Sequence, residues 1–379
     1  MLVLRRTTLK DEPSWNVQSW IPSLDPLRGV AALAVVICHA TSAWHLANSG
    51  ADSVSSTILS WLGNWGVTLF FVLSGFCIHL PQARAFVHNK HHRVDWARFA
   101  KRRARRLLPT HYAALILAAA LGIFVQTELI TAPTVASFTA HVFMVHVWFE
   151  PLFYSINAVF WSIAIEVHFY ICYPVYLWLR ERFGSGATTV FLLIAGLLTY
   201  GIGSAFLRGD SRFVIQHLFL VSWWQWALGA ALADMYVRGK GTQWARLLNF
   251  KFAPAFYAIL SIAVGLKDTT ILSLHIRFWI LPLTCGALLG SLVIRQCRHI
   301  PILSNAGIYS YSIYLIHPAA FAVLFAIPGY KALPAILGVP TTFVLAVFIS
   351  WGFFLLVEQH FLSNRQRAAE PVLALTRSN

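Results

Sequence analysis

The sequence predicts an all-α protein, a bundle of transmembrane helices that crosses a bilayer about ten times. Its composition is that of a membrane protein: 58% of the 379 residues are hydrophobic, only 11% are charged, and the mean hydropathy is +0.64. A soluble domain carries about a quarter charged residues. The apolar residues also gather in runs of roughly 20, the length that an α-helix needs to cross the hydrocarbon of a bilayer.

Ten apolar runs are candidates for membrane spans. They cover residues 29–47, 57–80, 107–126, 156–179, 187–206, 214–236, 252–267, 276–294, 303–327 and 336–358. The seventh run is the shortest. The stretch 129–150 is also apolar, but Pro133 interrupts it. Because proline breaks a helix, we expect an interfacial or re-entrant segment there rather than a span.

The basic residues predict that both ends of the chain lie in the cytoplasm. With the N-terminus inside, the inner segments hold 24 of the 29 Lys and Arg residues and the outer loops hold five. Cytoplasmic loops are enriched in Lys and Arg, so this asymmetry supports an N-in, C-in topology in the inner or plasma membrane. We expect one membrane domain at 23–362 between cytoplasmic tails at 1–22 and 363–379. The net charge of +15 then needs no nucleic-acid partner.

Ionisable side chains inside the predicted spans are the first candidates for function, because they are costly in hydrocarbon. Among them are His39, Glu166, His168, His217, Asp234, His317 and Glu358. Asp234 and Glu358 lie near inner span ends, where pairing with Arg or Lys explains them. His217 lies near an outer end and is expected to be interfacial.

His39 lies eleven residues after Arg28, a spacing of three helical turns and roughly 20° more. Both side chains therefore share a helix face, with Arg28 at the inner headgroups and His39 near the midplane. Glu166 and His317 fall at about the same depth in other spans. Two interpretations are open: a site in which a partner orients a general base, or a polar cluster that ties helices together.

Two further stretches have both a functional and a structural interpretation. Ser74 and Gly75 lie in the inner third of the second span, where a glycine permits close approach of a ligand or of another helix. The start of the third span is strongly basic, with Arg98, Lys101, Arg102, Arg103, Arg105 and Arg106. These residues either set topology and attract anionic lipid or bind phosphate oxygens. HNKHH at 88–92 lacks partners for a metal, and we expect neither a metal nor a permanently bound cofactor.

Five stretches together resemble the acyltransferase-3 family of membrane acyltransferases, of the sugar O-acetyltransferase type. LDPLRGVAALAVVICH resembles its first-span signature of arginine, ten residues and histidine. NWGVTLFFVLSGF and KRRARRLLPTHY are similar to its second-span motif and to its R-x-x-R start of span three. NAVFWSIAIEVHFYICYP resembles its W-S-x-x-x-E segment, and SYSIYLIHP its late S-Y-x-x-Y-L-x-H motif. The stretches occur in family order between residues 20 and 362.

The resemblance implies an enzyme that moves an acyl group, usually acetyl, from cytoplasmic acyl-CoA to a hydroxyl of a sugar, an envelope or secreted glycan, or a glycosylated metabolite. It implies that His39 is catalytic, with Glu166 or His317 orienting it or holding the sugar. Direct transfer and an acyl-histidine intermediate both remain open. The residues expected to bind acyl-CoA are Arg28, Ser74, Gly75, Arg102, Arg103 and Arg106.

The alternative is a transporter or flippase for a glycan or lipid, in which the midplane His and Glu residues relay protons. Ten spans suit a transporter. We find no inverted repeat and no matched pair of broken helices in the sequence. Modification that depends on acyl-CoA would distinguish the two classes.

Overall fold

The computed structural model describes residues 21–48, 54–88, 93–239, 248, 250–266, 271–295 and 300–362. Within these ranges the chain is helical, and its only strand pairing is an isolated antiparallel bridge between Ile130 and Asn157. The predicted all-α class is therefore confirmed. The predicted tails at 1–22 and 363–379 lie outside the described residues, apart from residues 21 and 22.

The helices follow the apolar runs of the sequence: each of the ten runs coincides with one helix or with two consecutive helices. The described helices are α1 Leu24–Asn48, α2 Val54–His88, α3 Trp96–Phe124, α4 Val135–Val142, η1 His146–Trp148, α5 Glu150–Phe153, α6 Phe160–Ile171, α7 Tyr173–Phe183, α8 Ser185–Phe206, α9 Gly209–His217, α10 Phe219–Arg238, α12 Ala253–Leu266, α13 Ile271–Ile294, α14 Pro301–Ile308, α15 Ser310–Phe325, η2 Tyr330–Ala332, α16 Ala335–Leu356 and η3 Glu358–Phe361.

Five of the described helices, α1, α2, α3, α8 and α16, are long and apolar enough to cross a membrane. Two broken pairs raise the number to seven if each pair is one span: α6 and α7 bend by 52°, and α14 and α15 by 73°. The chain is therefore a multi-pass membrane protein. The count of ten spans and the N-in, C-in orientation stay predictions.

Local signals explain several helix ends. The Asp95 side chain accepts a hydrogen bond from the Arg98 amide at the start of α3, which satisfies a backbone donor that the helix leaves free. A capping box between Thr134 and Ser137 starts α4. The stretch 129–150 then forms only α4, η1 and the start of α5. These elements are too short to span a bilayer, as predicted for this stretch.

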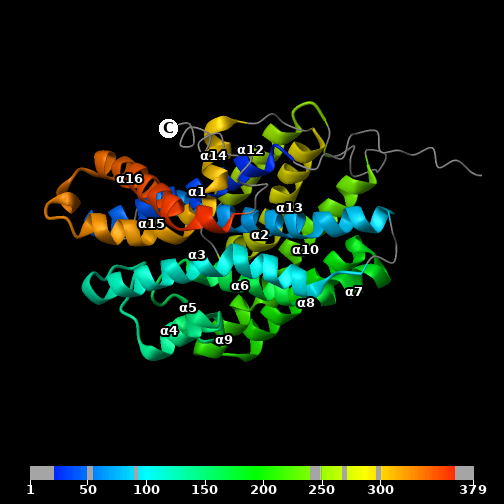
Figure 1. The fold of residues 1–379 in the computed structure, drawn as a ribbon, viewed down its shortest axis with the longest axis horizontal. Helices are drawn as coiled ribbons and strands as arrows, with labels where there is room; N and C mark the ends of the chain where they lie inside the picture. Colours follow the sequence, from blue (N-terminus) through cyan, green and yellow to red (C-terminus); the bar gives the residue numbers. More distant parts are fainter. Residues whose placement is uncertain are drawn as a thin grey trace, which may run out of the picture.

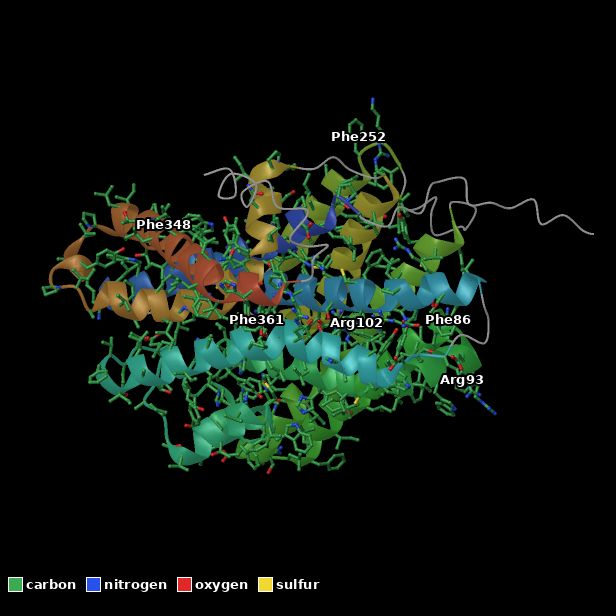
Figure 2. The ribbon with its side chains drawn as sticks, in the orientation of Figure 1. Phe86, Arg93, Arg102, Phe252, Phe348 and Phe361 are labelled. Carbon is green, nitrogen blue, oxygen red and sulfur yellow. The ribbon has the colours of Figure 1, made fainter. Side chains whose placement is uncertain are left out.

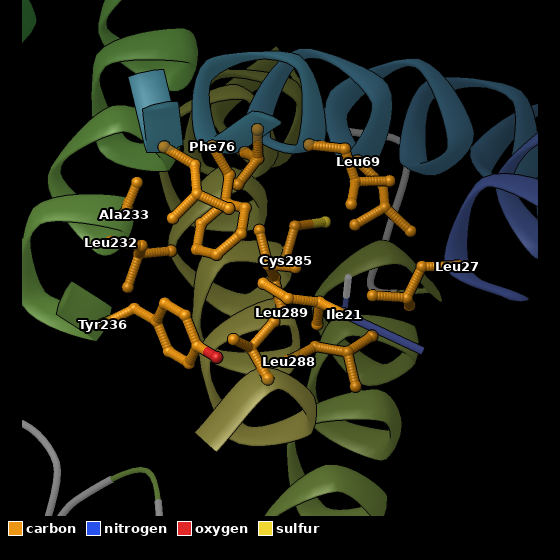
Figure 3. Packing of buried hydrophobic residues seen from close by; sticks show 14 of the residues in the cluster. Ile21, Leu27, Leu69, Phe76, Leu232, Ala233, Tyr236, Cys285, Leu288 and Leu289 are labelled. Carbon is orange, nitrogen blue, oxygen red and sulfur yellow. The ribbon is translucent and has the colours of Figure 1, made fainter. Parts of the chain in front are cut away.

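Figure 1 shows the long helices running roughly parallel, with the short α4 and α9 below α3 in this view. α3 packs against α15 and α4. α1 packs against α2, α14, α15 and α16, while α10 packs against α2, α8 and α13. Figure 3 shows the core that α2, α10 and α13 share. Its members include Leu69, Phe76, Leu232, Ala233, Tyr236, Cys285, Leu288 and Leu289.

Two glycines bring α2 and α10 into backbone contact. A Cβ at Gly75 would collide with the carbonyl oxygen of Trp226, and a Cβ at Gly229 would collide with that of Val72. Small residues allow such close helix approach in membranes. Gly75 therefore serves helix packing, the structural interpretation left open by the sequence.

Candidate active site

A cavity of about 640 Å³ lies among α1, α2, α3, α6, α14, α15 and η3. Figure 2 labels two of its lining residues, Arg102 and Phe361, in the band between α2 and α3. Two carboxylates, Asp25 and Glu166, line the cavity against six arginines. The arginines are Arg28, Arg84, Arg102, Arg103, Arg105 and Arg106. The ionisable side chains that line the cavity therefore carry a net positive charge.

α3 supplies four of these arginines because its first turns carry basic residues around much of the helix. Arg103 and Arg106, three positions apart, share a face and are half-buried, whereas Arg102 and Arg105 are exposed. The Nε of Arg103 and one Nη of Arg106 are buried without a hydrogen-bond partner among the described residues. The structure thus brings Arg102, Arg103 and Arg106 into one cavity with Arg28, as the sequence predicts.

Arg106 also forms an ion pair with a fully buried carboxylate. Its Nη2 lies 2.6 Å from Oε1 of Glu358. The other oxygen of Glu358 accepts hydrogen bonds from the amide of Ser312, at 3.0 Å, and from its hydroxyl, at 2.5 Å. A carboxylate suits the start of a helix, here α15. The predicted pairing of Glu358 with a basic residue is confirmed.

In the first turns of α1, Arg28 donates to Asp25 at 2.9 Å and to the sulfur of Cys77 at 3.1 Å. Ser74 lines the same cavity, and its hydroxyl lies 3.3 Å from that of Tyr170. Gly75, the other member of the predicted pair, is not among the residues found to line it.

Glu166 faces this cavity rather than the histidines. Its carboxylate accepts a 2.5 Å hydrogen bond from Tyr170, one helical turn away on α6. Within the described residues, Glu166 therefore forms its hydrogen bond with a residue of its own helix and has no contact with His39. Tyr170 was not singled out in the sequence, although its spacing of four from Glu166 is the signal that could have found it.

His39 and His317 form a direct pair. Nδ1 of His39 lies 2.8 Å from Nε2 of His317, and the two rings stack at a centroid distance of 5.1 Å. Nδ1 of His317 lies 3.0 Å from the carbonyl oxygen of Ile313. A carbonyl only accepts, so in the neutral pair His317 carries its proton on Nδ1 and accepts from His39 through Nε2.

This chain of hydrogen bonds fixes the tautomer of His39. Its proton sits on Nδ1, so its Nε2 carries a lone pair that is able to take a proton. His39 is partly exposed and His317 is fully buried. The geometry of a base oriented by a second group is therefore present, with His317 as the orienting group.

Asp234, His168 and His217, the other ionisable residues singled out in the sequence, have structural partners. Arg180 binds the carboxylate of Asp234 through two hydrogen bonds of 2.9 and 2.7 Å, as expected for Asp234. Nε2 of His168 accepts from Trp148 at 3.0 Å, and His217 stacks on Phe213. In the part of the chain that is described, no three His, Cys, Asp or Glu residues are arranged to hold a metal. HNKHH lies outside that part, apart from its first residue.

Comparison with known proteins identifies relatives among bacterial O-acetyltransferases. The chain is 24% identical over 191 residues to the peptidoglycan O-acetyltransferase OatA of Listeria monocytogenes, covering 48% of this chain and 28% of that protein. It is 30% identical over 169 residues to the putative peptidoglycan O-acetyltransferase YrhL of Bacillus subtilis, covering 42% and 24%. It is 26% identical over 208 residues to the O-acetyltransferase OatA of Staphylococcus aureus, covering 51% and 31%.

The matched part of the chain spans between about a quarter and a third of the length of these relatives. No solved structure matches the chain. The family model for the acyltransferase domain of the acyltransferase-3 family matches residues 21–355, which contain both the arginine-lined helix and the histidine pair. The chain therefore belongs to the acyltransferase-3 family of membrane acyltransferases.

Proposed function

We propose that this protein transfers an acyl group, in the first place acetyl, from cytoplasmic acyl-CoA to a hydroxyl of an envelope or secreted glycan. The proposal is supported mainly by the position of two features next to each other. An arginine-lined cavity lies beside an oriented histidine pair, and α15 contributes to both. The names of the relatives support a cell-wall glycan as the acceptor class.

Acyl-CoA suits the cavity by charge and by size. Its nucleotide end carries several phosphate charges, and arginine forks bind phosphate oxygens bidentately. A volume of about 640 Å³ lies within the range of ligand sites. The arm of the donor would pass Ser74 on its way from the arginines toward the histidines. Gly75 packs against α10, so this proposal gives it no contact with the donor.

In the proposed reaction, Nε2 of His39 takes the proton of the acceptor hydroxyl as the hydroxyl oxygen attacks the thioester carbon. The carbon–sulfur bond then breaks, and the CoA sulfur takes the proton from His39. His317 holds His39 in the required tautomer and stabilises its charged form through their hydrogen bond. An acyl-histidine intermediate would use the same Nε2 atom. Glu166, which lines the cavity, holds Tyr170 by accepting its hydrogen bond.

The proposal includes the predicted topology. A membrane domain at 23–362 with ten spans and cytoplasmic ends, in the inner or plasma membrane, would turn the basic start of α3 toward the cytoplasm. Acyl-CoA is made in the cytoplasm, so this orientation would deliver the donor to the arginines. Water would be kept from the thioester by the surrounding helices.

The transporter alternative gains one observation. The sequence shows no matched pair of broken helices, yet in the structure the fourth and ninth apolar runs are each broken, at α6–α7 and at α14–α15. Broken helices in corresponding halves are typical of transporter binding sites. Both breaks here border the arginine-lined cavity, so they suit a substrate site in either class.

The test is thiol release from acetyl-CoA by the purified protein, with and without a glycan extract of the host. We expect acceptor-dependent release by the native protein, its loss in His39→Ala, and its retention in the control His217→Ala, which removes a histidine stacked on Phe213 away from the pair. If the native protein releases no thiol and acetyl-CoA does not raise its thermal stability, the proposal fails and the transporter alternative takes its place.

A further inference from the structure

Tyr314 lies at the boundary between the arginine-lined cavity and the histidine pair. Its side chain lines the cavity and is almost fully buried. Its ring centroid lies 6.2 Å from that of His317, which contacts His39. Neither histidine is among the described residues that line the cavity. Tyr314 therefore touches both halves of the candidate site.

Two neighbours hold the Tyr314 ring in this place. Its hydroxyl lies 2.7 Å from that of Ser162 on α6. Its ring packs edge-on against Phe70 of α2, at a centroid distance of 5.9 Å and an interplanar angle of 77°. Ser162 and Phe70 also line the cavity. Side chains from α2, α6 and α15 thus meet in the part of the cavity wall that contacts His317.

This part of the cavity wall affects which acyl group is able to reach His39. For transfer, the thioester carbon and the acceptor oxygen must meet within about 3–3.5 Å, beside Nε2 of His39. A donor in the cavity brings its acyl end against Tyr314 and Phe70 first. An acetyl group needs little room there, whereas each further methylene adds volume against two aromatic rings.

We propose that Tyr314 is a specificity-determining residue that restricts the transferred group to short acyl chains. Ser162 is its positioning residue, because the hydrogen bond between the two hydroxyls keeps the ring across the end of the cavity. This inference rests on the proposed function. It accounts for two motif residues, Ser162 and Tyr314, that the proposed chemistry leaves without a role.

The experiment compares kcat/KM for acetyl-, propionyl-, butyryl- and hexanoyl-CoA with the same acceptor. We expect the native protein to prefer acetyl-CoA, and Tyr314→Ala to reduce the acetyl-to-butyryl preference by roughly tenfold or more, since one methylene in a tight pocket is worth about 10–200-fold. Tyr314→Phe removes only the hydrogen bond between the two hydroxyls, and Ser162→Ala removes that bond and a bond to the carbonyl oxygen of Val159, so a shift of about two- to tenfold is expected for each. Tyr200→Ala on α8 is the matched control and should leave the preference unchanged.

The outcomes separate this inference from the function on which it rests. If the native protein transfers acyl groups and neither Tyr314→Phe nor Ser162→Ala changes the chain-length preference, the inference is overturned and the proposed function stands. Those two variants preserve the packed volume, so they decide the matter even if Tyr314→Ala does not fold. If the native protein uses no acyl-CoA at all, both are overturned.

Discussion

Removing Arg106 should destabilise the protein far more than removing Arg103, although both belong to the same basic stretch. Arg106 lies 2.6 Å from Glu358, whose side chain is 0% exposed, while Arg106 is itself 23% exposed. Arg106→Ala leaves this carboxylate buried without its cation, which costs about 3–5 kcal/mol. Arg103 makes no ion pair among the described residues, so Arg103→Ala should cost about 0–1 kcal/mol.

The assay is thermal unfolding of the purified variants in detergent, followed by tryptophan fluorescence. We expect a much lower midpoint for Arg106→Ala than for Arg103→Ala. Adding Glu358→Gln to Arg106→Ala should restore part of the loss, because it removes the buried charge and keeps an oxygen that accepts from Ser312. Glu358→Gln alone should cost less than Arg106→Ala, since water reaches the freed guanidinium. The native protein, Arg106→Ala, Glu358→Gln and the double variant form a double-mutant cycle.

Equal, small losses for Arg106→Ala and Arg103→Ala would refute the reasoning, and so would a double variant no more stable than Arg106→Ala. The result also governs the test of donor binding. A variant that lacks both Arg103 and Arg106 loses a phosphate contact and also leaves the buried charge of Glu358 without its cation. Arg106→Ala combined with Glu358→Gln separates these effects.

Two further predictions concern packing and charge away from the histidine pair. Gly75→Val should force α2 from Trp226 and cost about 1–3 kcal/mol, read as a lower thermal midpoint; weaker binding of acetyl-CoA at unchanged stability would contradict the packing role. Asp234→Ala should leave Arg180 without its buried partner and cost about 3–5 kcal/mol, while Arg180→Met combined with Asp234→Ala recovers part of the midpoint. No recovery in the double variant would count against a charge effect.

Hydropathy predicts the helices of this protein well because the bilayer imposes one length and one polarity on every span. Each predicted run is helical, and the pairing of Asp234 and Glu358 with arginines follows from the cost of a bare charge in hydrocarbon. The sequence also predicts that His39, Glu166 and His317 share a depth. A shared depth does not determine which helix faces are in contact. The three-dimensional structure was needed to see that His39 contacts His317 and that Glu166 binds Tyr170 instead.

The breaks in the helices were harder to predict, because proline alone does not mark them. Pro318 lies inside α15 and the helix continues past it, while the 73° bend occurs at Tyr309, where no proline stands. A break frees backbone donors at the start of the next helix. Here Glu358 accepts from the amide of Ser312, 46 positions earlier in the chain. A partner so distant in sequence leaves no local signal.

The ion pair between Arg106 and Glu358 makes Arg106 differ from Arg103 as a binding group for an anion. The charge of Arg106 is already balanced by Glu358, which also binds the start of α15. Arg103 has a buried Nε without a partner and no ion pair within the described residues. An anion that enters the cavity therefore gains more from Arg103, because no carboxylate among the described residues already balances the charge of Arg103.

We accordingly expect Arg103→Ala to weaken the binding of acetyl-CoA more than the combination of Arg106→Ala and Glu358→Gln. Calorimetric titration at two salt concentrations measures this, since a lost phosphate contact also lowers the salt dependence of binding. A greater loss in the combined variant would contradict this order and make Arg106 the stronger phosphate contact. The donor would then bind the Nη of Arg106 that Glu358 leaves without a partner, next to the ion pair at the start of the helix that carries His317.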